Sequence, residues 1–290
     1  MTKNLDLRPL WAAQTIAVVG ATERVGAIGR LPIEYLTKFG FDGFIAPVNP
    51  KGGTILGLPT FQSMAEIPQH IELALIMVPA SSVREAVKDC AAAGVDVAIV
   101  MSSGFGEVDA DGQIAQQELV DIARADGMRL VGPNCIGSVG GAHRVIATFS
   151  PVFSSESTPL PAGNVALVSQ SGALGFGALS LGLERGVPIG IAITTGNEAD
   201  VTATEVAAQL AQDPEVDAVV MYVEALGNMD QLIRVAGSKP IAILKAGRSV
   251  AGAAAAASHT GALASPDKVV SAVLTQNGIA RANNIDELLD

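Results

Sequence analysis

Short apolar runs alternate with amphipathic segments along the first half of the chain. The apolar runs predict strands and the amphipathic segments predict helices. The predicted strands are 15–19, 43–48, 73–78, 95–101 and 129–131, and the predicted helices are 28–39, 82–93 and 111–125. Continuous apolar strands are typical of a parallel sheet with both faces covered. In such sheets, ligands bind beyond the carboxyl ends of the strands.

The alternation stops at residues 143–163, which are rich in Ser and Pro, and then restarts. We interpret this segment as a junction between two domains, residues 1–145 and 146–290. In the second half, the predicted strands are 165–168, 189–194, 218–223 and 241–244, and the predicted helices are 173–184, 201–212, 230–236 and 267–276. The pattern therefore predicts a second parallel α/β domain.

Composition narrows the class of protein. With 49% hydrophobic and 16% charged residues in 290, the chain has enough apolar material for two buried cores. The net charge of −11, without a run of Lys or Arg, argues against nucleic acid and membrane surfaces as partners. Cys90 and Cys135 cannot build a disulfide framework, and no apolar signal or spanning segment is present. We expect a cytoplasmic protein.

A glycine-rich turn follows the first predicted strand. Gly20, Ala21 and Thr22 open this turn, which leads into a helix and offers backbone N–H groups to a phosphate. The turn departs from the G-x-G-x-x-G fingerprint, because the next glycines stand at 26 and 29. By itself it indicates nucleotide binding only weakly.

The second strand ends in Asn49-Pro50-Lys51, with a cation where a dinucleotide site carries an acid for the ribose. Lys51 suits a phosphorylated ribose, such as the 3′-phosphate of coenzyme A or the 2′-phosphate of NADP. The alternative is a simple Asn-Pro turn with a solvated lysine. The other strand ends are also loops of small or turn-forming residues, which we expect to line a cleft for a long, thin ligand: Val78, Pro79, Ser102, Ser103 and Asn134.

The first strand of the second domain ends at the start of a helix. The turn there is Ser169-Gln170-Ser171-Gly172, whose hydroxyls and free N–H groups would form an anion site. The alternative is ordinary capping of the helix by serine. Asn197 follows the next strand in a loop of hydrogen-bonding groups.

His259 stands among small residues, between Ser258 and Thr260. Imidazole is a good nucleophile near neutral pH and can carry a phosphoryl group on nitrogen. Glu224 follows the third strand of the second domain, and a carboxylate bonded to one ring nitrogen would leave the other free to attack. The alternative is an exposed histidine without a role. No residues suggest a metal site in this chain.

Several motifs in order give the chain a resemblance to a known family. They are VVGAT at 18–22, VNPKGG at 48–53, LGLPTF at 56–61, VPA at 78–80, GPNCIG at 132–137, VSQSGAL at 168–174, TGNEAD at 195–200, YVEAL at 222–226, KAGRS at 245–249 and SHTGAL at 258–263. With these motifs the chain resembles the NDP-forming acyl-CoA synthetases from about residue 10 to 289. The motifs at 195–200 and 258–263 are closer to the ADP-forming acetyl-CoA synthetases than to the succinyl-specific enzymes.

The resemblance implies a Rossmann-like CoA-binding domain followed by a flavodoxin-like domain that carries a phosphohistidine. It puts His259 at the phosphorylated histidine, Glu224 at the carboxylate that orients it, and residues 169–172 at the phosphate-binding helix start. Lys51 and the loops at Gly20, Val78 and Ser102 correspond to CoA contacts.

The resemblance also implies the reaction and the partner. An ATP-grasp module would phosphorylate His259 from Mg²⁺-bound ATP, and the phosphoryl group would pass to a carboxylic acid. CoA would then attack the resulting acyl phosphate. No ATP-grasp motif occurs in these 290 residues. We therefore expect either a subunit that needs a separate beta chain or part of a longer fused enzyme, in an oligomer.

Two other functions are compatible with parts of the sequence. An NADP-dependent oxidoreductase would explain the first domain and Lys51, but not the motifs at 169–172 and 258–261. A CoA-sensing module without catalysis, as in fused protein acetyltransferases, would leave the second domain as a scaffold. Such modules usually lack the reactive histidine, so His259 and Glu224 favour the ligase.

Overall fold

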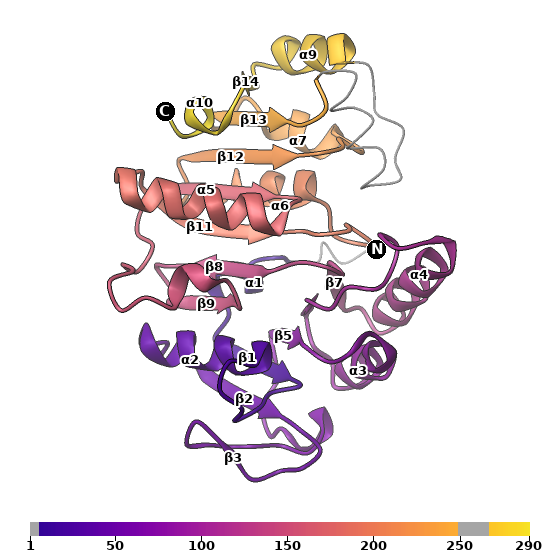
Figure 1. The fold of residues 1–290 in the computed structure, drawn as a ribbon. Coiled ribbons are helices and arrows are strands. Elements are labelled where there is room, and N and C mark those ends of the chain that lie inside the picture. The colour runs from indigo at the N-terminus through magenta and orange to yellow at the C-terminus, as the bar shows by residue number, and fades with distance from the viewer. Residues whose placement is uncertain (1–5, 249–266) are drawn as a thin grey trace.

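The structure, a computed structural model, describes residues 6–248 and 267–290. Two sheets built mainly of parallel strands lie next to each other, and the first half of the chain forms the lower one in Figure 1. The predicted fold class, an α/β domain followed by a flavodoxin-like α/β domain, is confirmed.

The first sheet has five parallel strands in the order β2-β1-β5-β6-β7. Its elements are β1 (Thr15–Val19), β2 (Phe44–Val48), β5 (Leu73–Ile76), β6 (Val97–Val100), β7 (Arg129–Val131), and the helices α2 (Leu31–Lys38), α3 (Ala80–Ala92) and α4 (Ala110–Ala125). Apolar residues of α3 and α4 pack on one face of this sheet, and α2 packs on the other. A short hairpin of β3 (Thr54–Ile55) and β4 (Leu58–Pro59) follows β2. Because the strands of the first sheet are parallel, the carboxyl ends of β1, β2, β5 and β6 meet at one rim.

The second sheet has seven strands in the order β14-β13-β12-β10-β11-β8-β9. Its elements are β8 (Gly137–Gly140), β9 (Val145–Thr148), β10 (Val165–Ser169), β11 (Ile189–Thr194), β12 (Ala218–Val223), β13 (Ile241–Lys245), β14 (Ala280–Ala282), α5 (Gly172–Arg185), α6 (Ala203–Leu210), α7 (Asp230–Val235), α9 (Asp267–Gln276) and α10 (Ile285–Leu289). The strands from β10 to β14 are parallel, and α5 covers one face while α6, α7 and α9 cover the other (Figure 1).

The hairpin of β8 and β9 extends the second sheet, because β8 pairs antiparallel with β11. The pattern analysis did not predict this hairpin. Its strands are four residues each, β8 contains two glycines, and β9 lies in the segment read as a junction. The predicted domain boundary at 145/146 falls inside β9, and the extent of each domain remains a prediction.

The two domains share one buried apolar cluster. Leu10 and Trp11, from α1 (Pro9–Ala12), lie in the same cluster as Val18 of the first sheet and Leu210 of α6. Trp11 Nε1 also donates to Asp213 Oδ2 over 3.0 Å. A continuous core of this kind fixes the domains against each other and stabilises the edges of any site between them.

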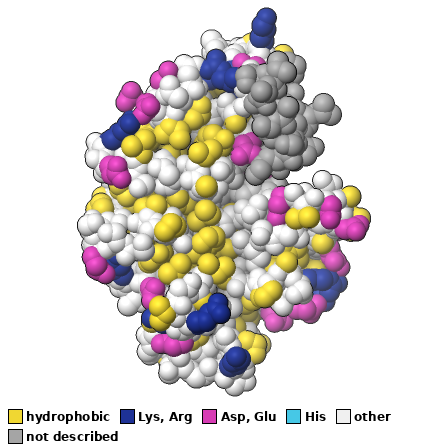
Figure 2. All heavy atoms as spheres, in the orientation of Figure 1, with side chains coloured by type: hydrophobic (Ala, Val, Ile, Leu, Met, Phe, Trp, Pro, Cys, Tyr) yellow, Lys and Arg dark blue, Asp and Glu magenta, His cyan; other side chains and the backbone are white. Residues whose placement is uncertain are grey.

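The distribution of basic side chains on the surface is consistent with the negative net charge of the chain. On the face that Figure 2 presents, Lys and Arg side chains are scattered and do not gather in a patch. Within residues 6–248 and 267–290, no helix is both long and apolar enough to cross a membrane.

Candidate functional site

The predicted CoA residues lie along the rim of the first sheet. Asn49 Nδ2 donates to the Ala21 carbonyl over 2.8 Å, which joins the loops after β2 and β1. Ser102 Oγ donates to the Val78 carbonyl over 2.5 Å, which joins the loops after β6 and β5. Lys51, Pro79 and Ser103 are exposed beside them. The rim thus presents hydrogen-bonded loops and the exposed cation of Lys51, and direct CoA contacts remain a prediction.

Gly20 makes the turn after β1 possible. Its φ of +91° is in the left-handed region, and a Cβ added there would lie 2.6 Å from the Met77 carbonyl oxygen. A side chain at this position would push the turn away from the end of β5. Gly20 N and Ala21 N both donate to the Val48 carbonyl, over 3.0 and 3.2 Å, which fastens the turn to the end of β2; phosphate binding at this turn remains a prediction.

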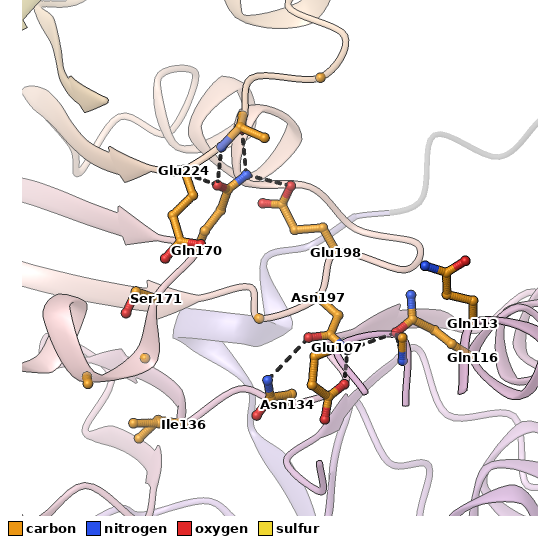
Figure 3. Close-up of a pocket in the computed structure, with 16 residues that line it drawn as sticks. Glu107, Gln113, Gln116, Asn134, Ile136, Gln170, Ser171, Asn197, Glu198 and Glu224 are labelled. Carbon is orange, nitrogen blue, oxygen red and sulfur yellow. Dashed lines mark hydrogen bonds between the residues drawn. The ribbon is translucent and has the colours of Figure 1, made fainter. Parts of the chain in front are cut away.

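A cavity of about 510 Å³ lies between the domains. Figure 3 shows Gln170, Ser171 and Glu224 on one side of it and Gln113, Gln116 and Glu107 on the other. The first group comes from the ends of β10 and β12, where the strand order of the second sheet reverses. The second group comes from α4 and the loop before it. The cavity therefore opens at the point where a parallel sheet is expected to bind its ligand.

The start of α5 supplies the wall of the cavity at which anion binding was predicted. Ser171 caps the helix by accepting from Leu174 N, and Ser171 and Gly172 line the cavity. Ser169 differs from them, because its side chain is buried and its hydroxyl donates to the Ser171 carbonyl over 2.6 Å. The turn is therefore shaped by Ser169 and faces the cavity through Gln170, Ser171 and Gly172. Phosphate binding by these residues remains a prediction.

The Gln170 amide ties the turn to Glu224. Its Oε1 accepts from Glu224 N over 2.6 Å and from Ala225 N over 3.0 Å. Its Nε2 donates to the Ala225 carbonyl and to Glu198 Oε2, both over 2.8 Å. Three of these four bonds hold the segment after β12 in one position, with the Glu224 side chain at the cavity wall.

Glu198 was not among the predicted site residues, although it lies in the TGNEAD motif next to Asn197. Its Oε1 accepts from Ala203 N over 2.7 Å and from Thr195 Oγ1 over 2.8 Å. Burial raises the pKa of Glu198 above its ordinary value, against these hydrogen bonds, and the nearby Glu224 adds to the rise. A second carboxylate thus stands beside Glu224 in the same wall.

The opposite wall joins the two domains through Asn197. Its Nδ2 donates to Glu107 Oε2 over 2.5 Å and to Gln116 Oε1 over 2.9 Å, and its Oδ1 accepts from Asn134 over 3.3 Å. Burial raises the pKa of Glu107, but hydrogen bonds from Gly104 and Asn197 outweigh it and lower the pKa overall. Sequence analysis missed Glu107 and Gln116, because only the docking of the domains brings them to the cavity.

The loop of Asn197 follows the first domain closely. Asn197 N donates to the Pro133 carbonyl over 2.9 Å, and Ala199 N donates to the Gly132 carbonyl over 3.0 Å. Gly196 has a φ of +58°, and a Cβ there would lie 2.3 Å from the Pro133 carbonyl oxygen. The glycine allows the two backbones to touch, so the cavity has walls from both domains.

His259, the predicted phosphoryl carrier, lies outside the described residues. The other three predicted residues at the strand ends of the second domain, Ser171, Asn197 and Glu224, all line the cavity. Among residues 6–248 and 267–290, no group of three or more His, Cys, Asp or Glu side chains could hold a metal ion. Cys135 is buried, and burial raises the pKa of its thiol to about 12, which leaves it un-ionised at neutral pH.

Family models match both halves of the chain. A CoA binding domain matches residues 14–141, and a succinyl-CoA ligase like flavodoxin domain matches residues 162–290. The first match covers the rim with Gly20 and Lys51, and the second covers the turn at 169–172 and Glu224.

Curated relatives extend the similarity over the whole chain. The alpha subunit of the ADP-forming acetate–CoA ligase I of Pyrococcus furiosus is 37% identical over 99% of this chain and 62% of its own length. The ADP-forming 4-hydroxybutyrate–CoA ligase of Nitrosopumilus maritimus is 32% identical over 97% of this chain and 40% of its own length. The chain thus spans less than two thirds of these relatives.

A solved structure is similar in both fold and sequence. It is the dinucleotide-forming acetyl-coenzyme A synthetase 1 of Ca. Korarchaeum cryptofilum, in complex with phosphate and ADP. Its TM-score is 0.91 at 34% identity, over 98% of this chain and 61% of that one. The chain therefore belongs to the NDP-forming acyl-CoA synthetase family, of which it carries the CoA-binding domain and the succinyl-CoA ligase-like flavodoxin domain.

Proposed function

We propose that this chain is the CoA-binding and phosphohistidine part of an ADP-forming acyl-CoA ligase. The observation that carries the proposal is the cavity between the domains, where the N-terminal turn of α5 and Glu224 face groups of the CoA-binding domain. An anion site, a carboxylate and a CoA domain in one place are what transfer of a phosphoryl group to an acid and then to CoA needs.

The proposed reaction has three steps. A nitrogen of His259 attacks the γ-phosphorus of ATP, so a P–N bond forms and the P–O bond to ADP breaks. A carboxylate oxygen of the acid then attacks that phosphorus, the P–N bond breaks and an acyl phosphate forms. Finally, the CoA sulfur loses its proton and attacks the acyl carbon. The S–C bond forms, the C–O bond to the phosphoryl group breaks, and phosphate leaves. An enzyme that makes ATP runs these steps backwards.

The residues divide these tasks. Glu224 holds the imidazole through one ring nitrogen, so that the other is free to attack. Gln170, Ser171 and Gly172 stabilise the phosphoryl oxygens with N–H groups at the positive end of α5. Lys51 binds the 3′-phosphate of CoA at the rim with Gly20 and Asn49.

The remaining parts of the reaction are proposed for a partner. ATP, with Mg²⁺, binds an ATP-grasp module, either a beta subunit or further domains of a longer chain, and the assembly is an oligomer. The named homologues that are alpha subunits support this division of tasks. We propose that the assembly works in the cytoplasm, where Cys90 and Cys135 stay as the free thiols that the structure has.

The test is acyl-CoA formation from Mg-ATP, CoA and acetate with the ATP-grasp partner present. We compare wild type with Glu224→Gln and with the exposed control Glu184→Gln. Loss of the carboxylate should lower the rate by about 10²-fold or more, as for other groups that orient a base. The control should leave the rate unchanged. An unchanged rate in Glu224→Gln contradicts the proposal, and CoA binding without any acyl-CoA favours the sensing module.

A further inference from the structure

A chain of hydrogen bonds runs from the start of α6 to Glu224. Ala203 N, at the first position of α6, donates to Glu198, and Glu198 accepts from Gln170 Nε2. Gln170 Oε1 in turn accepts from the backbone N–H groups of Glu224 and Ala225. Figure 3 shows Glu198, Gln170 and Glu224 in contact from three separate loops. The chain therefore links the loops after β10, β11 and β12.

The backbone donors at the two ends of this series of hydrogen bonds fix the direction of every bond in it. At one end, Ala203 N is a donor, and at the other, Glu224 N and Ala225 N are donors. Two side chains lie between these two sets of donors and bond to each other. One of them must only accept hydrogen bonds, and the other must accept from the backbone and donate to its neighbour. A carboxylate at 198 and an amide at 170 meet this requirement, and the Gln170 amide has only one orientation in which all its partners are satisfied.

Glu198 does more than cap α6. Thr202 is the N-cap residue of this helix, and its hydroxyl accepts from Glu205 N over 3.2 Å. Glu198 also adopts a φ of +55°, which is uncommon outside glycine and is sustained only where the surroundings impose it. A strained acidic residue with its carboxylate between α6 and Gln170 points to a demand from the site.

We propose that Glu198 is a positioning residue for Glu224, acting through Gln170. By accepting from Gln170 Nε2 and from Ala203 N, it keeps the Gln170 oxygen toward the backbone of residues 224 and 225. That backbone sets where the Glu224 carboxylate stands in the cavity. The inference rests on the proposed function, because it assigns Glu198 a part in the same phosphoryl transfer.

The proposal predicts how substitutions interact. In Glu198→Gln, the side chains at 198 and 170 are both amides, and every orientation of the two places one N–H group against another. The mismatch falls at Ala203 N, between the two side chains, or at Glu224 N. In Gln170→Glu, two carboxylates face each other and the bond to the Ala225 carbonyl is lost. In the double variant Glu198→Gln/Gln170→Glu, the new amide donates to the new carboxylate, and both backbone ends find acceptors again. Only the bond to the Ala225 carbonyl stays missing.

The experiment measures acyl-CoA formation with the ATP-grasp partner for wild type, both single variants and the double variant. CoA affinity and thermal unfolding are measured on the same samples. We expect each single variant to lower kcat about tenfold or more, the effect of one mispaired buried donor, with CoA affinity unchanged. We expect the double variant to recover most of that loss, because the coupling between the two positions is specific.

Thr202→Ala is the matched control, since it weakens the start of α6 without touching Glu198 or Gln170. It should lower the unfolding temperature and leave kcat within about twofold, because the loss of this cap weakens the start of the helix and leaves the Glu198–Gln170 bond in place. A double variant no faster than Gln170→Glu would overturn the proposal, as would a Glu198→Gln variant with wild-type kcat. If Glu198→Gln does not fold, the comparison of the double variant with Gln170→Glu still decides. A wild-type protein that makes no acyl-CoA removes the proposed function, and the role of Glu198 with it.

Discussion

Arg129 forms two parallel hydrogen bonds with Glu205 across the interface of the two domains. Nη1 donates to Oε1 over 2.8 Å and Nη2 to Oε2 over 2.9 Å, from β7 to α6. The same guanidinium donates through Nε to Asp200 Oδ2 over 2.9 Å. The Asp200 side chain has an exposed fraction of 0%, so its charge depends on these partners. The pair thus fixes α6, and the loop that carries Asn197 and Glu198, to the CoA-binding domain.

Arg129→Ala should destabilise the protein by about 1.5–3 kcal/mol, because it breaks the pair with Glu205 and removes one of the two guanidinium partners of the buried Asp200 carboxylate, which keeps Arg124. Arg84→Ala is the control: Arg84 also contacts two carboxylates, Glu85 and Glu118, but at the surface, where solvent screens the pairs and we expect a much smaller loss of stability. Thermal unfolding of the three proteins measures both effects. Equal losses of stability in the two variants would show that the interface pair contributes no more to stability than the exposed pairs of Arg84.

The same pair predicts how stability depends on pH. Burial raises the pKa of Asp200, but hydrogen bonds from Arg129 and Leu130 N outweigh it and leave the pKa below the ordinary value of 3.8. A carboxyl group with a lowered pKa stabilises the fold above pH 3.8 and loses that contribution as the pH falls through the lowered value. Acid unfolding curves of wild type should therefore show this loss, and Arg129→Ala should show less of it.

Lys51 should bind the 3′-phosphate of CoA. Lys51→Ala should weaken CoA binding about tenfold, the effect of one charge-assisted hydrogen bond, and leave the affinity for dephospho-CoA unchanged. Lys88→Ala, which removes an exposed lysine of α3, should change neither affinity. Titration calorimetry with the two ligands measures this. If Lys51→Ala weakens both ligands equally, or neither, the lysine only forms part of a turn.

The charges around the cavity predict which acids are poor substrates. Among the described lining residues, the charged side chains are all carboxylates: Glu107, Glu198 and Glu224. The segment 249–266 contains no Lys or Arg either. A second carboxylate on the acid would meet no cationic side chain among the described lining residues, so we expect butyrate to be used about tenfold or more better than succinate, which has the same number of carbons.

A cation in the wall should change that preference. Gln116 lines the cavity, and its Oε1 accepts from Asn197. Gln116→Lys should raise the rate with succinate relative to butyrate, whereas Gln117→Lys, on the exposed side of α4, should not. The ratio of kcat/KM for the two acids is the measurement. Succinate and butyrate used equally by wild type would mean that a partner supplies the missing cation.

The pattern of the chain predicted most of the fold and the rims of the sheets. Strand 15–19 is almost fully buried and strand 218–223 alternates between half-buried and buried residues, and both are apolar, so the residues that follow them, Gly20 and Glu224, could be assigned to a rim without a structure. The β8–β9 hairpin could not, because short strands with glycine carry little pattern of their own. Ser169 was expected beside Ser171 at the anion site, but strand alternation turns its hydroxyl inward.

The opposite wall of the cavity needed the structure. Glu107 and Gln116 lie 90 and 81 positions from Asn197 in sequence, and they meet it only because the Arg129 pair and the shared core dock the domains. Glu198 carries no signal that separates it from an ordinary loop carboxylate. Its bonds to Ala203 N and Gln170 depend on the fold, which brings the loops after β10 and β11 together.

The most direct test of the account is phosphorylation of the chain itself. The protein is mixed with its ATP-grasp partner and γ-labelled ATP, and acid-labile, base-stable label is measured in wild type, His259→Ala and the control His143→Ala. His143 is suited to the control because it pairs with Glu215 and neither residue lines the cavity. The account predicts label in wild type and in His143→Ala, discharge of that label by a carboxylic acid with CoA, and no label in His259→Ala. Label that persists in His259→Ala, or a wild-type chain that binds CoA and accepts no phosphate, would contradict it.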